Sequence, residues 1–350
     1  MEVKIALIGC GTVGRGLLEI LDRKRLQLKE AFDFEPKLVA ISDLHKGSIL
    51  VPDGIVIKQL FSLLDEDKRI DQYYGEGNTA ELINPLDMIE QCEADIIAEL
   101  TYTDIKTGEP ATGYIKKALR SGKHVVTSNK GPAALHYREL HKLAQKNNLF
   151  FRIEGTVMSG TPVFSLFECG LAGAEIREIK GILNGTTNFI LSKMEEDGMD
   201  YAAALKLAQE LGYAEADPTA DVEGYDAVAK VVILSNVLLG GDLKPEDVKR
   251  QGITALSREM VTAAKQEGFR YKLIARTSKS GKEIEASVSP QKLPLTDPLA
   301  GVMGAQNALT FDTDLLGKVT VQGAGAGKTE TGYSILADML AIHRHRRLKH

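Results

Sequence analysis

The first 150 residues alternate between short apolar runs and longer segments with apolar residues at helical spacing. The runs have the length of strands, and because they are apolar throughout, both faces of their sheet must be covered. This alternation predicts a doubly wound α/β domain, a Rossmann-type parallel sheet with helices on both faces. The predicted strands are 3–8, 37–42, 94–100 and 123–127, and the predicted helices are about 12–28, 110–121 and 133–147.

After about residue 150 the pattern becomes mixed. Two predicted strands, 150–154 and 176–183, are followed by three helices and by an alternating hairpin that turns at Gly281. We therefore expect a second, α+β domain. The last predicted helix ends at about Arg344, and we expect it to pack on the first domain. The predicted domains are 1–149, completed by 311–350, and 150–310.

Composition and charge narrow the class of protein. The chain has 350 residues, 43% of them hydrophobic and 26% charged, which is ordinary for a globular protein. Its formal net charge of -5 gives no reason to expect binding to nucleic acid or to an anionic membrane, and no apolar run is long enough to span a bilayer. Three widely spaced cysteines predict reduced thiols, and hence a cytoplasmic protein.

Gly9, Gly11 and Gly14 form a Gly-x-Gly-x-x-Gly pattern between the first predicted strand and its helix. Glycine permits the tight turn and lets backbone amides approach a pyrophosphate at the positive end of the helix. In this position the pattern predicts a dinucleotide-binding site. A second glycine-rich turn, 323–327, is not a P-loop, because Gln322 stands where that motif needs its first glycine.

Asp43 ends the second predicted strand, where an acidic residue commonly binds the adenosine ribose. Its carboxylate would accept hydrogen bonds from the ribose hydroxyls and favour NAD. Lys46 and Lys58 would instead meet a 2′-phosphate and favour NADP. The residues alone leave both cofactors open.

Lys230 is the only cation between Lys206 and Lys244, and it lies among apolar residues on a predicted helix. A lysine is almost never fully buried unless it is paired. Asp226 precedes it by four residues, on the same helical face, and is the natural partner. A charged amine held by a carboxylate in an apolar wall is suited to donating a proton. The alternative interpretation is a surface ion pair.

Lys130 follows the fourth predicted strand, at the sheet edge where open α/β sheets bind ligands. It is a candidate for binding a carboxylate, a carbonyl oxygen or the cofactor; the alternative is an exposed lysine at a helix start. The sequence contains no Ser/His/Asp arrangement in strand–turn–helix context, and Cys169 has no histidine nearby. Acyl-enzyme chemistry is therefore not predicted, and no cluster has the spacing of metal ligands.

Several segments, in this order, resemble homoserine dehydrogenase, and the resemblance runs over nearly the whole chain. The central segments are the most specific, whereas the N-terminal fingerprint is shared by many dehydrogenases. The matching segments are 9–14, 99–103, 108–110, 122–132, 154–162, 181–194, 213–230 and 323–331. The resemblance implies the interconversion of L-aspartate 4-semialdehyde and L-homoserine with NADPH or NADH, in threonine, methionine and isoleucine biosynthesis.

The resemblance also implies roles for individual residues. Lys230 would protonate the aldehyde oxygen, Asp226 would orient Lys230, and Lys130 would lie near the reacting oxygen and the nicotinamide. The residues implied in substrate binding are Glu215, for the ammonium group, Asp221 and Thr186. The residues implied in cofactor binding are Gly9, Gly11, Thr12, Val13, Gly14, Asp43, Thr101, Lys130 and Gly327.

Two further expectations come from the resemblance. A monovalent cation, sodium in particular, would be held by Glu154 and by the carbonyls of Val157, Ser159 and Thr161. The second domain would join two copies into a homodimer through its sheet.

Two other functions remain open at the level of the sequence. A semialdehyde-oxidising dehydrogenase would need a cysteine nucleophile, for which Cys169 is a poor candidate. A non-catalytic nucleotide-sensing module would bind the cofactor without turnover, and it gives no reason for a lysine in an apolar helix.

Overall fold

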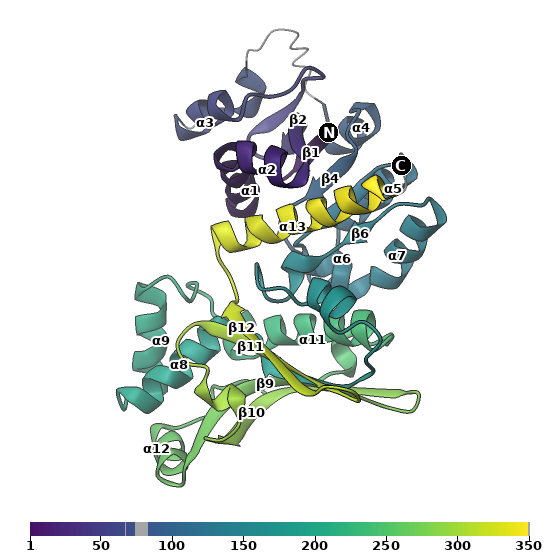
Figure 1. Ribbon diagram of the computed structural model, residues 1–350. Coiled ribbons are helices and arrows are strands. Elements are labelled where there is room, and N and C mark those ends of the chain that lie inside the picture. The colour runs from purple at the N-terminus through teal and green to yellow at the C-terminus, as the bar shows by residue number, and fades with distance from the viewer. Residues whose placement is uncertain (67, 74–82, 349–350) are drawn as a thin grey trace. The chain divides into compact units, whose positions relative to one another are not determined.

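The chain forms two compact units in the computed structural model, which describes residues 1–66, 68–73 and 83–348 (Figure 1). The first unit comprises Met1–Gly160 and Gly327–His350, and the second comprises Thr161–Ala326. The sequence pattern predicts that residues 311–326 belong to the first domain, and this prediction is wrong. They lie in the second unit. The reason is that the strands of this segment pair within the second sheet.

The first unit is built on a six-stranded sheet with the order β3-β2-β1-β4-β5-β6. The pairs from β2 through β6 are parallel, and β3 pairs antiparallel with β2. This arrangement confirms the predicted doubly wound fold. The strands are β1 (Glu2–Ile8), β2 (Glu35–Asp43), β3 (Gly47–Leu50), β4 (Ile96–Glu99), β5 (His124–Thr127) and β6 (Phe151–Arg152).

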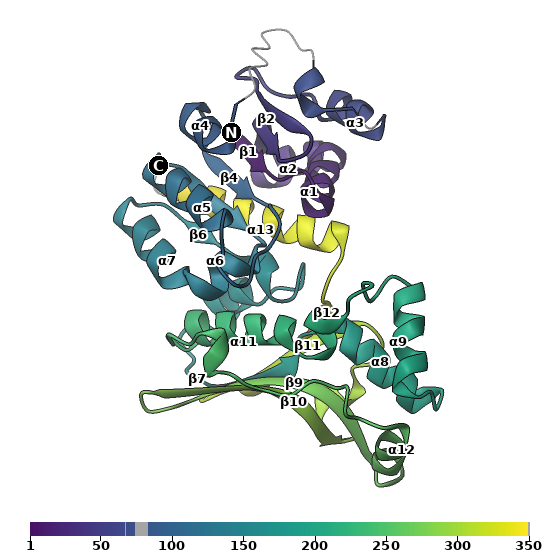
Figure 2. The ribbon, with the colours of Figure 1, turned by 180° about the vertical axis from the view of Figure 1, so that it is seen from behind.

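Helices cover both faces of this sheet, with α1 and α13 on one face and α5 and α7 on the other (Figures 1 and 2). Two predicted helices are each divided, the first at Lys24 and the other at His136. The helices of the first unit are α1 (Thr12–Arg23), α2 (Arg25–Phe32), α3 (Ile57–Asp65), α4 (Pro85–Gln91), α5 (Ala111–Arg120), α6 (Lys130–Leu135), α7 (Tyr137–Lys146) and α13 (Lys328–Arg347). Two short 3-10 turns accompany them, η1 (Ile70–Gln72) and η2 (Glu154–Thr156).

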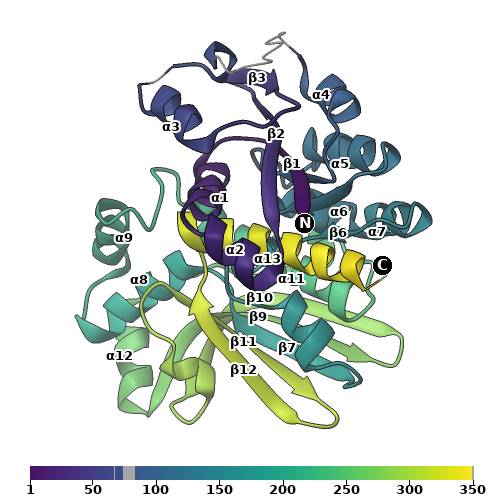
Figure 3. The same ribbon diagram turned by 45° about the horizontal axis from the view of Figure 1, so that its top comes forward.

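The last helix, α13, packs against α1 of the same unit, which confirms that expectation (Figure 3). Glycines allow the two backbones to approach closely. A Cβ at Gly16 would lie 2.2 Å from the carbonyl oxygen of Lys328, and one at Gly332 would lie 2.6 Å from the amide nitrogen of Leu17. Buried apolar side chains of both helices then join one core with the sheet. No helix among the described residues is long and apolar enough to cross a membrane.

The second unit carries a mixed sheet with the order β12-β11-β7-β9-β10-β8. Its longest strands form the predicted hairpin around Gly281. Helices α8 and α11 lie on the same face of the sheet in both views (Figures 1 and 2). The strands are β7 (Ile176–Ile182), β8 (Lys249–Arg250), β9 (Phe269–Ser280), β10 (Glu283–Pro294), β11 (Gln306–Thr313) and β12 (Gly317–Ala324). The helices are α8 (Gly185–Glu196), α9 (Tyr201–Glu210), α10 (Thr219–Val222), α11 (Tyr225–Leu238) and α12 (Arg258–Gln266), with short helical turns η3 (Leu166–Gly170), η4 (Pro245–Asp247) and η5 (Pro298–Gly301).

A buried lysine, Lys272 of β9, joins α8 to the chain that follows η5. Its side chain is 1% exposed, and Nζ donates to the Asn188 Oδ1 at 2.9 Å and to the Val302 carbonyl. Burial lowers the pKa of Lys272 from 10.5 to about 8. The ammonium form is therefore destabilised relative to a lysine in the unfolded chain.

We expect the contribution of Lys272 to stability to increase with pH. Between pH 8 and 10.5 the unfolded lysine binds more protons than the folded one, so the free energy of unfolding rises across this window. The free energy of unfolding, measured by chemical denaturation, should rise with pH in the wild type relative to Lys272→Met, by up to about 3 kcal/mol. A difference that is constant from pH 7 to 10 would contradict the lowered pKa.

Candidate active site

Lys230 and Asp226 form a partly buried ion pair on α11 of the second unit. The Lys230 side chain is 9% exposed and that of Asp226 is 16% exposed, and Nζ lies 2.7 Å from the Asp226 Oδ2. Nζ also donates to the Leu183 carbonyl at 2.7 Å, directly after β7. The helix buries nine successive residues, 227–235, and all of them except Lys230 and Ser235 are apolar. The paired, buried amine that the sequence predicted is present.

Asn184 connects this pair to a second carboxylate. Its Nδ2 donates to the Asp221 Oδ1 at 2.6 Å and to the Asp226 Oδ2 at 3.1 Å. Its Oδ1 accepts from the Thr187 amide at 2.9 Å and so caps α8. One side chain thus joins the start of α8 to two acidic residues that lie far along the chain. The sequence analysis did not select Asn184, although an asparagine directly before a helix is a common N-cap.

Asp221 occupies an unfavourable position for a charge. The pKa of its carboxyl group is raised. Burial is the largest cause and the nearby Asp226 adds to it, whereas the hydrogen bond from Asn184 lowers the pKa. The site therefore holds two carboxylates and one ammonium around one amide. Such a set provides a proton donor with acceptors beside it.

Thr186 and Glu215, the other two predicted substrate-binding residues, differ in their surroundings. Thr186 is 9% exposed, and its hydroxyl donates to the Tyr213 carbonyl at 2.6 Å. The Tyr213 ring packs on Phe189, with ring centroids 4.7 Å apart. Glu215 is exposed and follows two residues later in the same loop. The structure thus places Thr186 one residue from the amide network and Glu215 on the adjoining surface.

The fingerprint turn of the first unit combines crowded and open glycines. Gly9 has a φ of 99°, and a Cβ there would lie 2.4 Å from the Leu100 carbonyl oxygen. A Cβ at Gly14 would lie 2.5 Å from the Gly9 carbonyl oxygen. Gly11, by contrast, has open space where its Cβ would be. Thr12 and Val13 begin α1, whose N-cap Gly11 provides no side-chain hydrogen bond to the first amides.

Asp43 lies beside the fingerprint turn. Its Oδ2 accepts from the Cys10 amide at 2.8 Å, and its Oδ1 accepts from the amides of His45 at 3.0 Å and Lys46 at 3.2 Å. The Lys46 ammonium donates to the Cys10 carbonyl at 3.3 Å. Both the acidic and one of the basic candidates for contact with the adenosine ribose are therefore at the turn.

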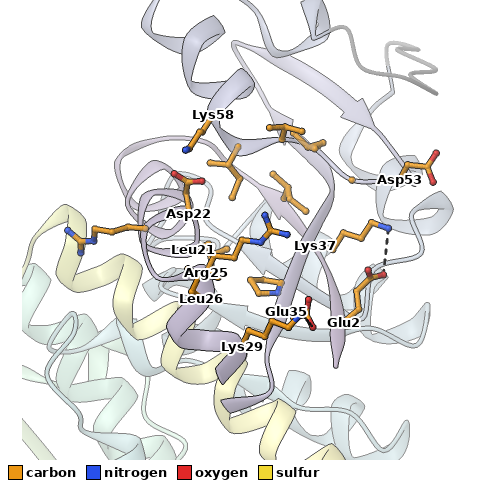
Figure 4. Close-up of a pocket in the computed structure, with 17 residues that line it drawn as sticks. Glu2, Leu21, Asp22, Arg25, Leu26, Lys29, Glu35, Lys37, Asp53 and Lys58 are labelled. Carbon is orange, nitrogen blue, oxygen red and sulfur yellow. Dashed lines mark ion pairs between the residues drawn. The ribbon is translucent and has the colours of Figure 1, made fainter. Parts of the chain in front are cut away.

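Lys58, the other basic candidate, is elsewhere. It borders a hollow of about 870 Å³ that opens at the amino ends of β1 and β2, together with residues such as Asp22 and Arg25 (Figure 4). The fingerprint turn follows the carboxyl end of β1, at the opposite edge of the sheet. The expectation that Lys58 meets a 2′-phosphate is therefore wrong, and the hollow is not the predicted cofactor site.

Thr101 and Lys130 lie after neighbouring strands, β4 and β5, on the carboxyl edge of the same sheet. Thr101 donates through both its amide, at 2.9 Å, and its hydroxyl to the Glu99 Oε1. Lys130 is half-buried and is the first residue of α6, behind the cap Asn129. This is the edge at which ligands bind in doubly wound sheets.

The predicted cation ligands surround η2 and the loop that follows. Glu154 is 2% exposed, and its amide donates to the Asp338 Oδ2 at 2.9 Å. Asp338 also pairs with Arg152 at 2.7 Å; burial, with the charge of Glu154 adding to it, raises the pKa of Asp338 to about 7. Both Asp338 oxygens therefore have partners, the Arg152 guanidinium and the Glu154 amide. Among the described residues no group of three or more His, Cys, Asp or Glu side chains could hold a metal ion, so any such site depends on backbone carbonyls.

The loop carbonyls belong to an unusual backbone. Ser159 has a φ of 53°, and its hydroxyl lies 2.7 Å from the Thr331 hydroxyl on α13. Val157 is buried. Thr161 begins the second unit, where its hydroxyl donates to the Ala324 carbonyl at 3.2 Å. Gly327, the last predicted cofactor residue, precedes α13 with a φ of 146°.

Comparison with known proteins gives matches over nearly the whole chain. The family model for homoserine dehydrogenase matches residues 162–340, and the model for the homoserine dehydrogenase NAD binding domain matches residues 9–154. The NAD(+)-dependent homoserine dehydrogenase of Pseudomonas canavaninivorans is 46% identical over 98% of this chain and 97% of its own length. The homoserine dehydrogenase of Methanocaldococcus jannaschii is 40% identical over 97% of this chain and 98% of its own length.

Solved structures agree. The crystal structure of a putative homoserine dehydrogenase from Archaeoglobus fulgidus has a TM-score of 0.86 and 39% identity, and the match covers 97% of this chain and 99% of that one. A hyperthermophilic archaeal homoserine dehydrogenase in complex with NADPH has a TM-score of 0.82 and 32% identity, with 99% and 98% covered.

Proposed function

The chain belongs to the homoserine dehydrogenase family, and on that premise we propose how its own residues carry out the reaction. The protein is an NAD(P)-dependent oxidoreductase that interconverts L-aspartate 4-semialdehyde and L-homoserine, in threonine, methionine and isoleucine biosynthesis. This identity decides against a semialdehyde-oxidising enzyme with Cys169 as nucleophile and against a nucleotide sensor without turnover.

We propose that Lys230 is the proton donor. In the direction of reduction, the bound nicotinamide supplies a hydride to the aldehyde carbon. The Lys230 ammonium gives a proton to the aldehyde oxygen, which becomes the hydroxyl group of homoserine, and the neutral amine is then reprotonated from solvent. Asp226, 2.7 Å from Nζ, holds the amine in place. This buried ion pair is the observation that carries the proposal.

The substrate has an ammonium and a carboxylate group, and the second unit offers partners for both. Glu215 would bind the ammonium, with Asp221 adding negative charge and Thr186 bordering the same place. The start of α8 offers the amides of Gly185 and Thr186 at the positive end of a 12-residue helix, next to the Asn184 cap. We propose that these amides bind the substrate carboxylate.

The cofactor is assigned to the carboxyl edge of the first sheet. The turn at Gly9, Gly11 and Gly14 and the first residues of α1, Thr12 and Val13, would bind the pyrophosphate. Thr101, Lys130 and Gly327 would bind the nicotinamide half, and Lys130 would stand near the reacting oxygen. Glu154, which is 2% exposed, would hold a sodium ion together with the carbonyls of Val157, Ser159 and Thr161.

The test is a steady-state assay of the purified protein with L-homoserine, run in parallel with NAD and NADP and followed by absorbance of the reduced cofactor. Turnover that needs L-homoserine is the expected result. If neither cofactor is reduced although both bind, the proposed residues do not form a site for this substrate. Sedimentation of the same protein tests the homodimer, and its location in the cell, proposed to be the cytoplasm, is tested by fractionation.

We propose that NAD is the preferred cofactor, because the Asp43 carboxylate lies beside the fingerprint turn, where it would bind the ribose hydroxyls and repel a 2′-phosphate. Asp43→Asn keeps an acceptor for the Cys10 amide but removes the charge. We expect the ratio of kcat/KM for NAD to that for NADP to fall at least about tenfold, the effect of about 1.4 kcal/mol. Asp53→Asn, at the hollow on the opposite edge, is the matched control. An unchanged ratio in Asp43→Asn would place the ribose elsewhere.

A further inference from the structure

Glu99 is a buried carboxylate at the carboxyl end of β4 that the proposed reaction does not use. Its side chain is 0% exposed, although it ends a strand that is otherwise apolar. Burial raises the pKa of this carboxyl group, and it outweighs the hydrogen bonds from Thr101, Thr127 and Asn129, which lower the pKa. A buried acid is costly unless its oxygens are well satisfied, so its presence here needs a reason.

The Glu99 carboxylate joins the loops after two adjacent strands. Oε1 accepts from the amide and the hydroxyl of Thr101, and Oε2 accepts from the Thr127 hydroxyl at 2.9 Å. Thr127 in turn accepts from the Asn129 amide at 2.9 Å. The Asn129 side chain donates to the Tyr102 carbonyl at 3.2 Å and, at 3.4 Å, to that of Thr101. These bonds close a ring that starts and ends at Glu99.

The ring fixes two groups assigned to the nicotinamide half of the cofactor. The Thr101 hydroxyl donates its hydrogen bond to Glu99, so its oxygen can take part in a further hydrogen bond only as an acceptor. No donor reaches that oxygen within the described part of the chain, and Thr101 is partly exposed. Asn129 also accepts from the Gly131 amide at 3.1 Å and so caps α6, which begins with Lys130. The position of Lys130 therefore depends on the same ring of hydrogen bonds.

We propose that Glu99 is a positioning residue for the cofactor: it turns the Thr101 oxygen outward as an acceptor for an N–H or O–H group of the nicotinamide nucleoside, and it sets the start of α6. This inference rests on the proposed cofactor roles of Thr101 and Lys130. Glu99 itself touches neither the cofactor nor the substrate.

The test measures cofactor affinity apart from turnover. We expect Glu99→Gln to raise the dissociation constant of NADH, followed by its fluorescence without substrate, at least about tenfold, because an amide has one acceptor oxygen for three donors. The KM for L-homoserine should change less than about threefold, because Glu99 touches no residue proposed to bind the substrate. Glu93→Gln, an exposed carboxylate paired with Lys4, is the matched control. Unchanged NADH affinity in a folded Glu99→Gln protein would overturn the proposal.

Two further variants separate positioning from general loss of structure. Thr127→Val removes one donor of the ring without touching a proposed cofactor ligand, and it should weaken NADH binding about threefold even if Glu99→Gln does not fold. In the double-mutant cycle of Glu99→Gln with Thr101→Val, the losses in affinity should be less than additive. Additive losses would show that Glu99 does not act through Thr101. Failure of the homoserine assay in the wild type would count against the proposed reaction, and the NADH measurements would still decide the role of Glu99.

Discussion

Replacing Lys230 with alanine should slow the reduction of L-aspartate 4-semialdehyde at least about a hundredfold, the usual effect of losing a general acid. Hydride transfer to an aldehyde leaves negative charge on the oxygen, and a proton from Nζ removes it. Without this amine, water must supply the proton beside the partly buried Asp226 carboxylate. NADH affinity should not change, because Lys230 belongs to the second unit and the fingerprint turn to the first.

The matched control for this variant is Lys193→Ala. Lys193 also pairs with an aspartate four residues away on a helix of the second unit, Asp197 at 3.0 Å, but its side chain is 28% exposed. Surface pairs of this kind contribute little, so turnover and stability should stay near those of the wild type. A Lys230→Ala enzyme with near-normal kcat would refute the proton-donor assignment. A loss of activity accompanied by lost NADH binding would point to unfolding instead.

Much of the fold follows from the apolar pattern of the sequence. All four strands predicted in the first 150 residues are present, because a parallel sheet covered on both faces requires runs that are apolar throughout. The strands β11 and β12 were not predicted. β11 is buried along most of its length, whereas β12 is largely exposed and carries glycine and threonine. β11 pairs with β7, more than a hundred residues earlier, and β12 pairs with β11. Local pattern does not report such partners.

The site residues likewise fall into those that the sequence predicts and those that it does not. The Asp226–Lys230 pair could be predicted, because four residues on a helix bring two side chains to one face. Asn184 and Glu99 could not, since each becomes important only through contacts with residues far along the chain, such as Asp226 and Thr127. Lys46 and Lys58 looked equivalent in sequence. They are separated by the direction of the strands, which places one at the carboxyl edge and the other at the amino edge.

We expect Gly9→Ala to destabilise the first unit strongly, although it adds only one methyl group. Its φ of 99° is costly for any residue with a Cβ, and that Cβ would lie 2.4 Å from the carbonyl oxygen of Leu100. A backbone oxygen cannot turn aside as the end of a flexible side chain can. We expect the free energy of unfolding to fall by about 2–4 kcal/mol, the range of strain at a special backbone position, with loss of NADH binding.

Gly11→Ala separates the two reasons for glycine in this turn. Gly11 has a φ of −78°, which alanine adopts, and its Cβ would meet no atom within 4 Å. Urea denaturation should therefore show a stability within about 0.5 kcal/mol of the wild type. NADH affinity should nevertheless fall at least about tenfold, because the methyl group occupies the space assigned to the pyrophosphate. Normal NADH affinity in Gly11→Ala would mean that the pyrophosphate does not approach this residue. Normal stability in Gly9→Ala would mean that the turn relaxes away from β4. The first glycine is thus required by the fold, and the second by the ligand.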